Sequence, residues 1–140
     1  MTKPTSVALV FPQGAEEPIR FYREVFRDAE TLHEHRSPDG KHVATNLRIR
    51  GTEFILISGG PDCTFSMASS FMIFGDTQEE IDYYWAALGE GGTEYACGWL
   101  SDRFGVTWQV TPSKYGDWVT LGTPEQAEAA FQTLISQTKI

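Results

Sequence analysis

The sequence has few cysteines, little positive charge and no long apolar run. Among its 140 residues are only two cysteines, Cys63 and Cys97, which make neither a disulfide framework nor a closely spaced metal pair. Eleven Lys and Arg stand against nineteen Asp and Glu, which gives a formal net charge of -8. Because so acidic a chain repels phosphate backbones, we expect no nucleic-acid partner.

No apolar stretch is long enough to span a bilayer, and the N-terminal residues carry no cleavage signal. We therefore expect no membrane partner and a cytoplasmic location. Hydrophobic residues make up 41% of the chain and charged residues 21%, proportions that favour a folded core over disorder.

The first half of the chain alternates between strand and helix signals. Residues 7–11 (VALVF) predict a buried strand, and the apolar spacing in residues 15–26 predicts a helix. Three more strands are expected at residues 30–36, 41–50 and 52–58, where a Ser-Pro-Asp-Gly turn and Gly51 separate them.

The second half begins in the same way. Residues 70–74 predict a buried strand, and Asp76 with Glu79 predicts a capping box at the start of a helix. Further strands are expected at residues 94–101 and 106–112. A last helix is expected from Thr123 to about residue 138.

The two halves correspond when the chain is shifted by 62 residues. Ala8 then falls on Ser70, and the strand, the loop and the helix phase all match without a gap. The sequence therefore predicts an α+β fold of two βαβββ modules, about 5–60 and 68–113, with a C-terminal helix at about 123–138. We expect these parts to form a single domain over residues 1–140.

The segment CGWLSDRFGVTWQVTP, residues 97–112, resembles the signature of the PhnB-like branch of the vicinal oxygen chelate (glyoxalase/bleomycin-resistance) superfamily. The pair Phe21-Tyr22 and the glycines 91 and 92 are similar to other parts of that pattern. The resemblance implies paired βαβββ modules whose sheets curve around a cavity, and it implies a homodimer. Some descriptions of this branch mention a demethylubiquinone methyltransferase, but no glycine-rich nucleotide loop follows a strand here, and 140 residues leave no room for a separate cofactor domain.

In metal-using members of the superfamily, His or Glu ligands occupy four strand positions that face the cavity. The resemblance places these positions at Ala8, Ser70, Gln109 and, to within one residue, Leu56. None of the four is a good ligand for a catalytic divalent ion. We therefore expect no metal and no cofactor.

The leading hypothesis is a protein that binds a small, partly apolar molecule in a metal-free cavity. Its expected lining consists of Ala8, Leu56, Ser70, Met72, Trp99, Thr107 and Gln109, although Trp99 could equally belong to the core. Three alternatives stay open: an enzyme of the same fold (lyase, isomerase or dioxygenase type) with unusual active-site residues, a sequestering resistance protein, and an interaction module with a filled core.

Other candidate site residues have simpler interpretations. His33, His35 and His42 flank the predicted hairpin and could form a surface metal site, but an exposed polar hairpin is the simpler interpretation. Cys97 could line the cavity, and a structural thiol is a simpler interpretation than a nucleophile. Asp102 and Arg103 are most simply turn residues.

Overall fold

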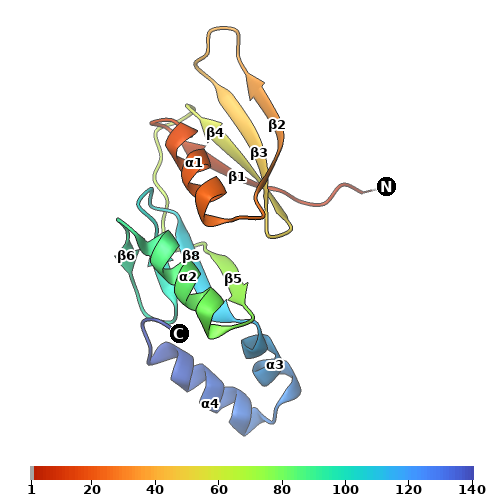
Figure 1. The fold of residues 1–140 in the computed structure, drawn as a ribbon, viewed down its shortest axis with the longest axis vertical. Coiled ribbons are helices and arrows are strands. Elements are labelled where there is room, and N and C mark those ends of the chain that lie inside the picture. Colours follow the sequence, from red (N-terminus) through yellow and green to blue (C-terminus); the bar gives the residue numbers. More distant parts are fainter. Residues whose placement is uncertain (1) are drawn as a thin grey trace. The chain divides into compact units, whose positions relative to one another are not determined.

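Alternating apolar residues build two four-stranded sheets, one in each of two units, Met1–Cys63 and Thr64–Ile140 (Figure 1). The computed structural model describes residues 2–140, apart from the side chains of Trp118 and Val119. The first unit contains β1 (Val7–Phe11), α1 (Glu16–Val25), β2 (Glu30–Arg36), β3 (Val43–Ile49) and β4 (Thr52–Ser58). The second contains β5 (Phe71–Gly75), α2 (Gln78–Gly89), β6 (Thr93–Glu94), β7 (Trp99–Ser101), β8 (Thr107–Pro112), α3 (Lys114–Leu121) and α4 (Pro124–Ile135).

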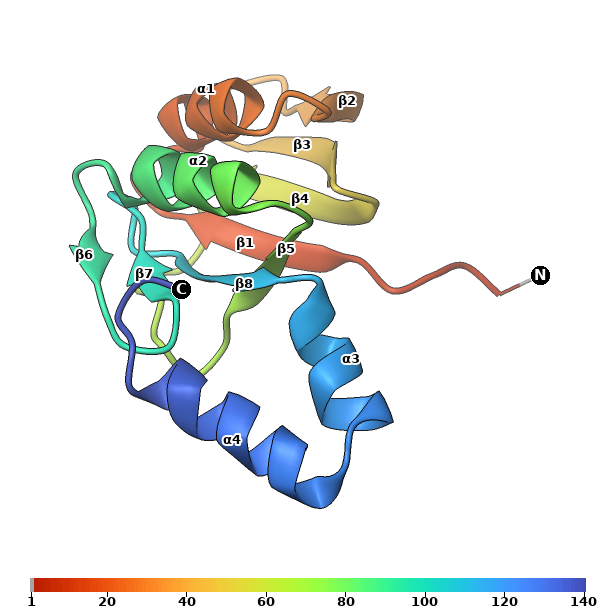
Figure 2. The same ribbon diagram turned by 60° about the horizontal axis from the view of Figure 1, so that its bottom comes forward.

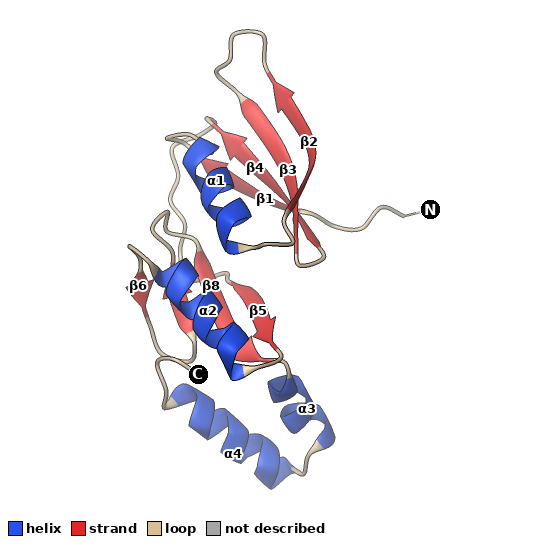
Figure 3. Cartoon of the chain, in the orientation of Figure 1, coloured by secondary structure: helices blue, strands red, loops and turns tan. Residues whose placement is uncertain are grey.

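The two sheets share one connectivity. Their strand orders are β1-β4-β3-β2 and β5-β8-β7-β6, and in each the first and last strands of the module pair in parallel. The other neighbours are antiparallel. This arrangement confirms the predicted pair of βαβββ modules, and Figure 3 shows α1 with the first sheet and α2 with the second.

In the first unit, α1 covers one face of the sheet. Its buried side chains include Phe21, Tyr22 and Val25. The strands contribute Leu9 and the other buried side chains that point to the same face of the sheet. The start of the helix is tied to the end of β4, since the backbone N–H of Ala15 donates to Ser58 Oγ at 2.8 Å. This bond satisfies one of the amide donors that a helix start leaves unpaired.

In the second unit, α2 packs on β5, β7 and β8 (Figure 2). It buries Ile81, Tyr84, Trp85 and Leu88. At Gly75 an added Cβ would lie 2.5 Å from Ile81 Cγ1, so the missing side chain lets the helix come close. Gly75 thus marks which face of the second sheet the helix covers.

The start of α2 differs from the sequence prediction by one residue. Thr77, rather than Asp76, is the N-cap, and its side chain accepts from the backbone N–H of Glu80 at 3.1 Å. Asp76 instead accepts a hydrogen bond from Ser113 Oγ at 2.6 Å. Both residue types are good N-caps, so sequence alone leaves their order open.

The C-terminal part holds one helix more than the sequence predicts. The predicted helix is α4, which opens with the capping box Thr123–Gln126, and α3 precedes it. The two helices form a hairpin that leaves the end of β8, and the chain then returns to the loop before β7 (Figures 1 and 2). Among the described residues, no helix is long and apolar enough to cross a membrane.

Candidate functional site

The two faces of the second sheet have different surroundings. Ile73, Leu100, Trp108 and Val110 are buried on the face toward α2. The register of the strands puts the alternate residues on the other face, because side chains along a strand point to opposite sides in turn. That second face carries five of the seven predicted site residues.

Three of them form one row across the strands. Met72 of β5 pairs with Gln109 of β8, and Gln109 pairs with Trp99 of β7. Thr107 lies on the same face beside Ser101, and their hydroxyl oxygens are 3.5 Å apart. Ser70 directly precedes β5, where strand alternation continues this face. The structure therefore brings together Met72, Gln109 and Trp99, with Thr107 and Ser70 next to them.

The side chain of Gln109 has a fixed orientation. Its Nε2 donates to the backbone carbonyl of Cys97 at 3.0 Å. This bond uses the amide's donor end and leaves Oε1 as an acceptor on the row. Gln109 is only 9% exposed, so a hydrogen bond made there is sheltered from water.

Two buried polar atoms lie on this face without a hydrogen-bond partner among the described residues. They are Trp99 Nε1 and Thr111 Oγ1. Thr111 is two residues beyond Gln109, pairs with Phe74 and is fully buried. An unsatisfied buried polar group costs about 1–3 kcal/mol. Because the protein itself covers both atoms, a bound molecule would recover that energy only where neighbouring side chains move aside.

Sequence reasoning did not include Thr111 among the site residues. Strand alternation could have identified it, because Thr107, Gln109 and Thr111 are alternate residues of one strand and therefore share a face. Strand spacing alone does not reveal which hydroxyl lacks a partner.

In the first sheet, the position that the sequence predicts as Leu56, to within one residue, corresponds to Ile57 in the strand register. Leu56 pairs with Leu9, is fully buried and shares its face with Ser58, which binds the start of α1. The neighbour Ile57 pairs with Val10 as Gln109 pairs with Met72, so Ile57 is the counterpart of Gln109. Ala8 lies on the same face as Ile57 and is exposed.

The strand positions at which the resemblance expects metal ligands are Ala8 and Ile57 in the first sheet and Ser70 and Gln109 in the second. Two are apolar and the other two are neutral, so they do not fit a catalytic divalent ion. Within residues 2–140, no group of three or more His, Cys, Asp or Glu side chains could hold a metal ion. The three histidines of the first unit and both free cysteines belong to these residues.

The signature turn is held by Asp102, which is buried. Its Oδ1 accepts from the backbone N–H groups of Phe104 and Val106, at 2.9 and 3.1 Å. Its Oδ2 accepts from Trp108 Nε1 at 2.9 Å. These bonds support the interpretation of Asp102 as a turn residue and fix the start of β8, which carries Gln109.

The paired sheets, with one helix each, define a fold of the vicinal oxygen chelate type. The sequence model of the family described as 3-demethylubiquinone-9 3-methyltransferase matches residues 3–111. The chain therefore belongs to that family, the PhnB-like branch of the superfamily. A comparison with curated protein sequences finds no match.

Solved structures agree with this assignment. A PhnB protein from Bacillus cereus, also described as 3-demethylubiquinone-9 3-methyltransferase, is 27% identical, with a TM-score of 0.71 over 79% of this chain and 100% of that chain. The fosfomycin resistance protein FosX from Listeria monocytogenes is 14% identical, with a TM-score of 0.61 over 91% of this chain and 98% of that one. Another FosX structure from that bacterium, in complex with Mn(II) and sulfate, is 15% identical, with a TM-score of 0.58 over 79% of this chain and 91% of that one. The FosX structures are similar in fold.

Proposed function

We propose that this protein binds a small, partly apolar molecule, without a metal ion, on the face of the second sheet that points away from α2. The observation that carries the proposal is the row of Met72, Gln109 and Trp99, beside two buried polar atoms that have no hydrogen-bond partner in the described part of the chain. Met72 and the ring of Trp99 supply apolar contact area. Gln109 Oε1 supplies an acceptor, and Trp99 Nε1 and Thr111 Oγ1 supply a donor and a hydroxyl once the side chains that cover them move aside.

The chemistry of the row favours a neutral ligand. Its polar groups are an amide, an indole N–H and hydroxyls, none of which carries charge at neutral pH. A charged ligand would lose its hydration without gaining an ionic partner from these side chains. Ser70 and Thr107 extend the same uncharged surface of the second sheet.

Methyl transfer does not follow from the family's description. A nucleotide-like methyl donor is usually held by a glycine-rich turn between a strand and the start of a helix. Here the connection from β1 to α1 has Gly14 alone, and the connection from β5 to α2 is Asp76-Thr77. These connections do not fit such a donor.

The proposal is tested with four neutral aromatic probes: phenol, indole, benzamide and 1-naphthol. We expect at least one of them, at millimolar concentration, to shift the indole N–H resonance of Trp99 and to raise the melting temperature. Replacing Gln109 with Met removes the amide at similar size and should weaken binding up to about tenfold, the value of one hydrogen bond. The matched control Gln132→Met, on exposed α4, should leave binding unchanged.

Treatment with EDTA tests the metal-free part of the proposal, and probe binding should persist after it. A tightly bound divalent ion in the purified protein, lost in Gln109→Met, would contradict that part. If no probe moves the Trp99 resonance, the binding proposal itself fails.

We also infer a homodimer, as the family resemblance implies, and a cytoplasmic location. Light scattering at micromolar concentration should then give twice the chain mass of 15.7 kDa. A monomer mass would refute the dimer and leave the binding proposal intact.

A further inference from the structure

The loop before β7 contains a two-residue bridge, Cys97-Gly98, between β8 and the C-terminal tail, residues 137–140. The backbone N–H groups of Cys97 and Gly98 donate to the carbonyls of Gln137 and Thr138, at 2.6 and 2.8 Å. Their own carbonyls accept from β8. Cys97 O binds Gln109 Nε2 at 3.0 Å, and Gly98 O binds the backbone N–H of Val110 at 2.8 Å.

Both bridge residues have a left-handed backbone, with φ of 64° at Cys97 and 73° at Gly98. Glycine adopts this conformation freely, whereas a residue with a Cβ is disfavoured in it. At Gly98 an added Cβ would also lie 2.5 Å from Val110 O and 2.9 Å from Ile140 Cγ1. Cys97 has no such freedom, so the contacts on either side must hold it in place.

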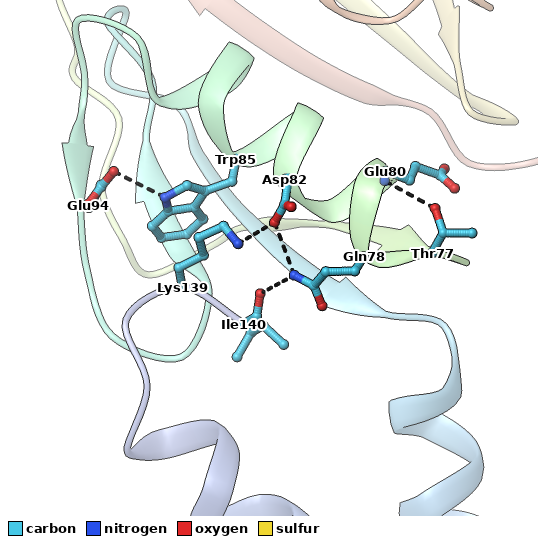
Figure 4. A network of polar contacts seen from close by, with 8 residues as sticks. All are labelled: Thr77, Gln78, Glu80, Asp82, Trp85, Glu94, Lys139 and Ile140. Atoms are coloured by element: carbon cyan, nitrogen blue, oxygen red, sulfur yellow. Dashed lines mark hydrogen bonds and ion pairs between the residues drawn. The ribbon is translucent and has the colours of Figure 1, made fainter.

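The tail is also held from the side of α2 (Figure 4). Lys139 forms an ion pair with Asp82. Gln78 Nε2 donates to Asp82 Oδ1 at 3.0 Å and to the Ile140 carbonyl at 3.2 Å. The tail therefore has anchors on α2 and on the bridge, and it lies beyond residues 3–111, which the family model matches.

We propose that the docked tail positions Gln109. The tail occupies the two bridge N–H groups and keeps Cys97 left-handed, and in that conformation the Cys97 carbonyl holds the donor end of the Gln109 amide. When the tail leaves, Cys97 relaxes out of the left-handed region. Gln109 then loses the hydrogen-bond partner of its Nε2, which keeps its Oε1 on the side of Met72 and Trp99. The link from tail to ligand rests on the proposed function, whereas the link from tail to Gln109 can be measured without any ligand.

The experiment compares the full chain with a variant that ends at Ser136, which leaves α4 complete. In the full chain, the side-chain amide protons of Gln109 and the backbone amides of Cys97 and Gly98 should be protected from exchange. In the shortened variant, exchange at the two backbone amides should be about tenfold faster or more, and the Gln109 amide signal should move toward that of an exposed glutamine.

Substitutions at Cys97 separate positioning from simple loss of structure. Cys97→Gly removes the cost of the left-handed backbone, so in the shortened variant it should restore the Gln109 amide signal. Cys97→Ala keeps a Cβ and should not restore it. If Gly and Ala behave alike, or if the Gln109 signal ignores the tail, the proposal is overturned.

A point variant covers the case in which the shortened chain does not fold. Lys139→Met in the full chain should speed exchange at Cys97 and Gly98 by a few-fold, since an exposed ion pair contributes modestly. Lys114→Met removes the same charge from the exposed start of α3 and should change neither amide. Equal effects of the two lysine variants would overturn the proposal. None of these outcomes depends on whether the aromatic probes bind, so the two proposals fail separately.

Discussion

The buried carboxylate of Asp102 gives a sharp test of what stabilises the second unit. Replacing Asp102 with Ala removes the acceptor of three hydrogen bonds, from Phe104 N, Val106 N and Trp108 Nε1. Trp108 is 1% exposed, so its indole N–H would be left unpaired in the core, at a cost of about 2 kcal/mol. The Val106 amide adds about 1–2 kcal/mol and the Phe104 amide less, which gives a loss of about 4 kcal/mol in the free energy of unfolding.

Urea unfolding followed by tryptophan fluorescence measures this loss. All four tryptophans, at positions 85, 99, 108 and 118, lie in the second unit, so the signal reports that unit. Asp102→Asn should lose about 2 kcal/mol, because its Oδ1 still accepts from the turn amides while its Nδ2 meets the indole donor. Asp117→Ala, an exposed change on α3, should cost about 0.5 kcal/mol or less. A loss below about 1 kcal/mol for Asp102→Ala, or an Asn variant as stable as the parent, would refute the reasoning.

Two further predictions concern α2. Thr77→Ala removes the N-cap bond to the Glu80 amide, and the same unfolding assay should show a loss of about 1 kcal/mol; an unchanged midpoint would mean that Asp76 caps the helix instead. The Lys139 ammonium, with Gln78, holds the pKa of Asp82 below its ordinary value. A carboxyl with a lowered pKa stabilises the docked tail above its unfolded pKa and loses that contribution as pH falls through the lowered value. The NMR signals of the tail should therefore stay unchanged from pH 7 to about pH 5 and move only below about pH 4, and release nearer pH 6 would contradict the assignment.

The sequence was sufficient to predict which face the helix covers in β1, β5 and β8, but not in β4. In β1 and β8 the bulky apolar residues alternate with smaller or polar ones, so the side toward the helix could be read directly. β5 has bulky residues on both faces, and its assignment came from β1 through the 62-residue correspondence. The β4 segment TEFILIS has apolar residues on both faces, so the alternation of side chains does not tell which face the helix covers. The register with β1 decides it and moves the site position from Leu56 to Ile57.

Tertiary contacts account for what the sequence did not predict. Residues 94–101 read as one strand, but the left-handed pair Cys97-Gly98 divides them into β6 and β7. Glycine permits such a conformation without requiring it, and a cysteine gives no sign of it. The helix α3 was missed because Gly116 and Thr120 weaken its local propensity, which pattern reasoning depends on.

The outermost strand of the first sheet also has a consequence for how the protein avoids aggregation. All seven residues of β2 are exposed, and the strand order leaves its outer edge without a neighbour in that sheet. A long bare edge invites pairing with another chain and growth into cross-β assemblies. Here ion pairs join Glu34 to Arg36 and Glu30 to Arg48, and the register shifts between Thr31 and His33. Charge and irregular geometry together make β2 a poor template, which protects the sheet from edge-to-edge polymerisation.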